Sequence, residues 1–150
     1  MLRLLRELRR DTWGTMAVET ALVVPVLALL SIGGFEVSAM VARQNELQGA
    51  AAEAGQIALA ASPDTDAKRA TLKNIIVTST GLPASKVTIT MKFRCGATTT
   101  LQTTNNCANA SDKVSTYVEI YMTDTFVPSW KKFGVGTNMT YRVTRRVMLS

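Results

Sequence analysis

The chain has 150 residues, which is enough for one domain or for a membrane anchor followed by a small domain. Its net charge is +6 and it contains no histidine, so it lacks the commonest general base and the commonest catalytic metal ligand. The lysines and arginines are scattered along the sequence rather than clustered with aromatic residues, and we therefore predict no nucleic-acid partner. Because no catalytic motif or phosphate-binding loop is present, we also predict no enzyme activity, no cofactor and no metal site.

A basic N-terminal stretch precedes a long apolar segment. No residue from Thr20 to Phe35 is charged, and with the preceding few residues this segment reaches the length of a membrane span, at about residues 16–35. Only Arg43 follows the segment closely, whereas four arginines precede it, so the positive-inside rule predicts a cytoplasmic N-terminus. In a bacterium the remainder would then lie in the periplasm. The four preceding arginines are Arg3, Arg6, Arg9 and Arg10.

Glu19 lies within this membrane-spanning stretch. A charged side chain near the bilayer centre costs roughly 2.5–3.5 kcal/mol on insertion scales, so its presence suggests a functional role. A simpler alternative is that Glu19 lies at the headgroup level of a helix that begins near Val18. The same segment contains Pro25, which removes one backbone hydrogen bond.

The helical pattern continues beyond the membrane segment. Apolar and small residues recur at helical spacing, and no proline falls between Val26 and Ser62, so we predict one helix over residues 15–61. Its alanine-rich stripe suits close packing against another helix, but it could equally dock on the chain's own domain. The stripe comprises Val37, Met40, Gln44, Leu47, Ala51, Ala54, Ala58 and Ala61.

Residues 62–150 are predicted to form a small α+β domain. The sequence Ser62–Thr65 supplies a helix stop and a new N-cap, and a short helix is expected from Asp66 to about Thr78. Three segments then alternate apolar and polar residues, at 87–94, 114–123 and 138–149. Each has one apolar face, as a three-stranded or slightly larger antiparallel sheet packed on a helix requires.

The only two cysteines, Cys95 and Cys107, bracket a polar loop rich in threonine and asparagine. They are too few for a tetrahedral zinc site in a chain without histidine, and their spacing is not that of a thioredoxin-like redox motif. We interpret them as a disulfide formed in an oxidising compartment, where it would stabilise the fold by about 3 kcal/mol. Two unpaired, buried thiols are the alternative.

The N-terminal block also carries a recognisable combination of residues, most clearly between Arg9 and Ala61. It resembles the TadE-like family, the minor pseudopilins of the tight-adherence (Flp-type) pilus system. The sequence departs from the family pattern at Thr20, where an aromatic residue usually follows the glutamate. The matching residues are Arg9-Arg10, Gly14, Ala17-Val18-Glu19, Ala21-Leu22-Val23, Pro25, Glu36, the segments 44–48 and 50–52, the two cysteines, Phe126, Pro128 and the final segment 145–148.

This resemblance implies a processing site and a set of partners. A prepilin peptidase would cut between Gly14 and Thr15, so residues 1–14 would be a cytoplasmic leader and Thr15 the new N-terminus. The Glu19 carboxylate of one subunit would then neutralise the new ammonium group of a neighbour. The implied partners are the peptidase, other pilins or pseudopilins, and inner-membrane components of the pilus machinery. The implied location is the bacterial inner membrane, with possible incorporation into a pilus.

Two other functional classes fit the sequence. The first is an uncleaved, single-pass, membrane-anchored periplasmic binding module. The second is a secreted protein whose signal segment is removed near Gly33, where Ser31-Ile32-Gly33 is a weak cleavage motif. These two hypotheses and the pseudopilin hypothesis each predict a different first residue of the mature chain.

Overall fold

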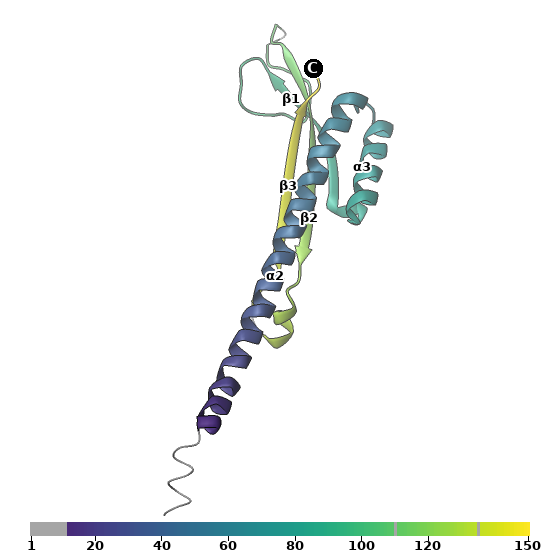
Figure 1. Cartoon of the computed structure of the whole chain (residues 1–150). Helices are drawn as coiled ribbons and strands as arrows, with labels where there is room; N and C mark the ends of the chain where they lie inside the picture. The colour runs from purple at the N-terminus through teal and green to yellow at the C-terminus, as the bar shows by residue number, and fades with distance from the viewer. Residues whose placement is uncertain (1–11, 110, 135) are drawn as a thin grey trace, which may run out of the picture. The chain divides into compact units, whose positions relative to one another are not determined.

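The computed structural model describes residues 12–109, 111–134 and 136–150, and divides the chain into two compact units, residues 1–39 and 40–150. The order of elements is that of an α+β protein with an N-terminal helix, as predicted (Figure 1). The elements are α2 (Thr12–Ala61), α3 (Asp66–Thr80), η1 (Ala84–Lys86), β1 (Val87–Cys95), β2 (Val114–Phe126), η2 (Ser129–Phe133) and β3 (Met139–Met148).

The residues at their ends explain where α2 stops and where α3 begins and stops. The backbone N–H of Ser62 donates to the carbonyl of Ala58 at 3.0 Å, and the following Pro63 cannot continue the helix. The Thr65 hydroxyl caps α3 by accepting the N–H of Lys68. Gly81, at φ 66°, closes α3 in the left-handed conformation that glycine adopts without strain, so the helix ends at Thr80, two residues beyond the predicted end.

The three strands form an antiparallel sheet in the order β1-β2-β3, as the alternating patterns predicted. The central strand β2 pairs with both neighbours and runs three residues further than expected, to Phe126. Its alternate residues Val118, Ile120 and Met122 are completely buried and form the centre of the core. The other face of β2 contains no buried side chain.

The alanine-rich stripe packs inside the chain's own domain. Leu47, Ala51, Ala54 and Ala58 are at most 2% exposed and share one core with the sheet and with α3. Small side chains let the helix backbone approach the sheet closely. The docking alternative is therefore confirmed for these four residues, and they offer no surface to another helix.

Gly55 of α2 lies close to the side chains of β3. A Cβ atom there would lie 3.2 Å from Val147 Cγ2 and 3.5 Å from Arg145 Cγ, whereas one at Gly49 would meet nothing within 4 Å. We therefore expect Gly55→Leu to lower the free energy of unfolding by about 1–3 kcal/mol through overpacking. The matched variant Gly49→Leu should be neutral or stabilising, since leucine is the better helix former. Equal unfolding midpoints of the two variants in denaturant would contradict this packing.

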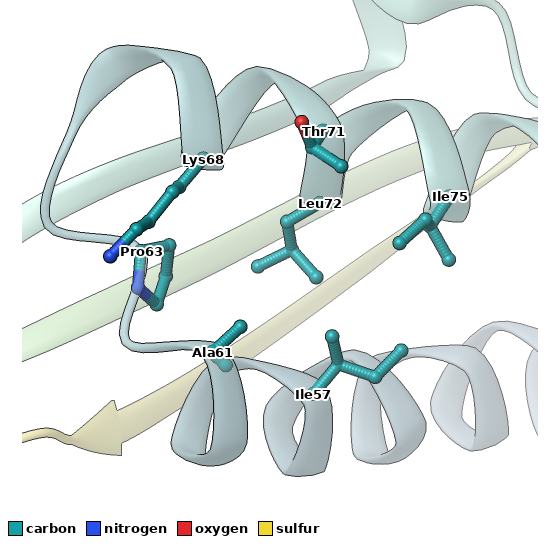
Figure 2. Close-up of a pocket in the computed structure, with 8 residues that line it drawn as sticks. Ile57, Ala61, Pro63, Lys68, Thr71, Leu72 and Ile75 are labelled. Atoms are coloured by element: carbon teal, nitrogen blue, oxygen red, sulfur yellow. The ribbon is translucent and has the colours of Figure 1, made fainter.

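An apolar groove of about 210 Å³ lies between the end of α2 and α3. Figure 2 shows Ile57 and Leu72 projecting into it from the two helices, with Lys68 at one end. The ammonium of Lys68 donates to the Asp64 carboxylate at 2.8 Å, and this hydrogen bond lowers the pKa of Asp64. None of the residues predicted to be functional lines the groove.

Candidate assembly surface on the N-terminal helix

The first part of α2 exposes apolar side chains on every side. Twelve large apolar residues between positions 16 and 37 are each 47–77% exposed. A helix that is apolar all round normally lies in a protein core or in a membrane. Among the described residues, one helix is long and apolar enough to cross a membrane, judged by length and composition alone. It spans Met16–Ala61. The twelve are Met16, Val18, Leu22, Val23, Val24, Val26, Leu27, Leu29, Leu30, Ile32, Phe35 and Val37.

Two hydroxyl groups in this segment are bonded to the helix itself. Thr20 Oγ1 donates to the carbonyl of Met16 and Ser31 Oγ donates to the carbonyl of Leu27, both at 2.8 Å. Hydroxyls that bond the preceding turn need no water, which makes them acceptable in an apolar environment. The departure from the family pattern at Thr20 therefore places no unpaired donor in the segment.

Glu19 is the only ionisable residue between positions 16 and 35. Its side chain is exposed, and within the described part of the chain no hydrogen-bond or ion-pair partner is found for it. A carboxylate on such a helix is costly to transfer into lipid unless a cation or a proton neutralises it. Glu19 is thus an ionisable side chain without a partner among the described residues, in a helical segment whose other side chains are apolar or internally hydrogen-bonded.

The predicted cleavage site lies at the start of α2. Gly14 and Thr15 are the third and fourth residues of the helix, and Thr15 is one helical turn before Glu19. Arg3, Arg6, Arg9 and Arg10 lie outside the described residues.

Arg43 links three elements of the second unit. Its Nε donates to Asp124 Oδ2 on β2 at 2.7 Å, and its Nη1 contacts the Thr80 carbonyl of α3 and the Glu46 carboxylate. Burial acts to lower the pKa of Arg43, but Glu46 and Asp124 outweigh it, so this pKa is raised. The Tyr141 hydroxyl donates a hydrogen bond to the nearby Met40 carbonyl. Burial is the main cause that raises the pKa of Tyr141, and the charge of Asp124 raises it further.

Removing this link should cost measurable stability. We expect Arg43→Leu to lower the free energy of unfolding by about 1–3 kcal/mol, because the half-buried Asp124 loses its cation. The double variant with Asp124→Leu should recover part of that loss, since no unpaired charge is left. Strictly additive losses in urea unfolding would show that the pair is not coupled.

The predicted disulfide is confirmed. Cys95, the last residue of β1, is bonded to Cys107, with their Cα atoms 5.7 Å apart. The loop between them folds back on β1, where Phe93 and Gln102 exchange two backbone hydrogen bonds of 2.8 Å. The alternative of two unpaired thiols is therefore wrong.

Comparison with known proteins found a family model that matches the segment containing Gly14, Glu19 and Arg43. The family model described as TadE-like protein matches residues 14–56. Residues 14–56 are a TadE-like segment. This TadE-like segment indicates involvement in a tight-adherence (Tad) pilus system and association with components of its machinery. Neither the comparison with curated proteins nor that with solved structures found a match.

The TadE-like segment covers most of α2 and none of the sheet. It contains the exposed apolar surface and also Leu47, Ala51 and Ala54, which anchor the helix in the core. In the sequence, Arg43 is recognisable only as a charge that follows the apolar segment. Its partner Asp124 is 81 residues away, so no local pattern could have indicated their contact.

Proposed function

We propose that the chain is a minor pseudopilin of a tight-adherence pilus and that it acts in assembly without catalysing a reaction. The observation that carries the proposal is the position of Glu19 within an exposed, all-round apolar helix that is TadE-like. In this proposal a prepilin peptidase removes residues 1–14, and the new N-terminus at Thr15 begins the assembled helix. The subunit needs no cofactor, metal ion or nucleic acid.

Electrostatics gives Glu19 its role in this proposal. Cleavage creates an ammonium group at Thr15, and a carboxylate in a medium of low dielectric is stabilised by such a cation at short range. Pairing offsets the desolvation of both charges only in good geometry, so it favours one register of neighbouring helices. The ammonium can also reach Glu19 of its own chain, four residues away on the same face, before a neighbour replaces it.

Two observations support the proposed orientation across the membrane. Four arginines precede the apolar segment, which favours a cytoplasmic N-terminus. The Cys95–Cys107 disulfide lies in the second unit, and disulfides persist on the oxidising side of the inner membrane. In this arrangement residues 62–150 are periplasmic and reach the pilus with the assembled helix.

Deletion of the gene tests the proposal against its alternatives. We expect cells without the chain to lose surface pili in electron micrographs and to regain them when the wild-type gene is supplied. A membrane-anchored binding module or a secreted protein would leave the number of pili unchanged. Normal piliation of the deletion strain would therefore refute a role in assembly.

A further inference from the structure

The sheet has an outer face, opposite the helices, that is centred on Tyr117, Glu119 and Tyr121 of β2. The side chains on this face alternate with the buried ones, and every one of them is half-buried or exposed. The register aligns Thr90, Glu119 and Arg146 in one row across the three strands, and Lys92, Tyr117 and Met148 in the next. The face is continuous over the width of the sheet.

The outer face is strongly basic. It gathers Lys92, Arg94, Arg142 and Arg146, which are scattered in the sequence, around the single acid Glu119. Both oxygens of Glu119 are engaged, one by Arg146 Nε at 2.6 Å and the other by Lys92 Nζ at 3.9 Å. Among the described residues no carboxylate pairs with Arg94 or Arg142, so the face keeps a positive charge that favours an anionic partner.

Hydroxyl groups and aromatic rings fill the rest of the outer face. Tyr121 lies between Thr88 and Thr144, one on each neighbouring strand. The guanidinium of Arg94 lies 5.5 Å from the ring centroid of Tyr117. Threonine and tyrosine hydroxyls both donate and accept hydrogen bonds, and a tyrosine ring also offers an apolar surface.

Two classes of anionic partner, acidic proteins and single-stranded nucleic acids, fit this face poorly. A stable protein interface needs an apolar centre, and on the described outer face Met148 is the only large apolar side chain that is more than half exposed. Single-stranded nucleic acid needs several open rings for successive bases, but Arg94 lies over Tyr117 and leaves Tyr121 as the only other aromatic ring that the three strands place on this face. Sugars that carry carboxylates match both the arginines and the hydroxyl-rich rows.

We propose that the outer face binds an acidic polysaccharide, which lies along the sheet with its carboxylates on the arginines and a sugar ring on Tyr121. This inference does not depend on the proposed role in pilus assembly, since it uses only residues of the second unit. It assigns a ligand class to a surface that the TadE-like segment does not include.

Binding to polygalacturonate tests the proposal with the full chain in detergent micelles. We expect salt-sensitive binding to polygalacturonate and none to neutral dextran. The double variant Arg142→Gln/Arg146→Gln should bind on the order of fivefold more weakly, because each exposed charge pair contributes up to about 1 kcal/mol. Tyr121→Thr should weaken binding by about threefold without changing the charge, through loss of ring packing.

The matched control removes the same charge from other surfaces. Lys73→Gln/Arg145→Gln changes one residue on α3 and one on the core side of β3, and its affinity should stay within about twofold of wild type. Unchanged thermal unfolding of each variant shows that the sheet is intact. Equal losses in both double variants would overturn the proposal. Tighter binding to oligodeoxythymidylate or to polyglutamate than to polygalacturonate would also overturn it, by assigning the face to nucleic acid or to acidic protein.

Discussion

Replacing Glu19 with alanine is expected to abolish incorporation of the chain into the pilus machinery while leaving membrane insertion intact. The variant removes a charge that costs roughly 2.5–3.5 kcal/mol to insert, so the membrane-bound amount should not fall. It also removes the carboxylate proposed to pair with the N-terminal ammonium of a neighbour, and the register of packing is then no longer selected. Comparing the chain in membrane and sheared-pilus fractions measures both effects.

Two further variants separate charge from shape at this position. Glu19→Gln keeps the size of the side chain but not its charge, and we expect it to fail in assembly as Glu19→Ala does. Thr20→Val changes the adjacent residue, whose hydroxyl is satisfied by Met16, and should assemble normally. Wild-type levels of Glu19→Ala in the pilus fraction would mean that Glu19 does not set the register.

Replacing both cysteines with serine is expected to lower the free energy of unfolding by about 3 kcal/mol. The disulfide closes a loop with a sequence separation of 12, and its removal increases the entropy of the unfolded chain. The folded state should change little, because Phe93 and Gln102 still hold the loop against β1. Urea unfolding of wild type and double variant measures the difference.

Reduction of the wild-type protein provides the control. Wild type unfolded with a reductant should match the Cys95→Ser/Cys107→Ser variant, and without reductant its cysteines should resist alkylation under denaturing conditions. Full labelling of both thiols without reductant would show that the bond does not form in the native protein. Equal stability of wild type and variant would show that the bond contributes nothing to the fold.

The secondary structure could be predicted because its signals are local. The alternation of apolar and polar residues in the sequence predicted that Val118 and Ile120 share one face of a strand. In β2, buried and half-buried side chains alternate in the same way. Gly81 ends α3 because an unstrained left-handed residue is available there. The ends of strands were less predictable, since β2 extends to Phe126 only through its pairing with Met139 of β3.

Contacts between distant segments could not be predicted in the same way. The alanine stripe fitted either a neighbouring helix or the chain's own sheet, and the periodicity is the same in both cases. Arg43 and Asp124 gave no signal because they are adjacent only in the folded chain. The basic outer face was missed for a related reason, since Lys92, Arg142 and Arg146 meet only through strand pairing.

The candidate assembly site depended on two kinds of argument. The cost of a carboxylate in an apolar helix identified Glu19 from elementary electrostatics. Gly14 and Thr15 carry no such physical signal and were identified by resemblance, which the match of residues 14–56 supports at the level of the family. Cleavage between them is a proposal with one direct test.

The N-terminal sequence of the chain extracted from membranes tests this account most directly. Cleavage by a prepilin peptidase predicts a mature chain that starts at Thr15, with Glu19 as its fifth residue. A chain that starts at Met1 would contradict processing and support an uncleaved anchor. A start near Gly34 or Phe35 would instead show that the apolar segment is a removable secretion signal, and that Glu19 is lost with it.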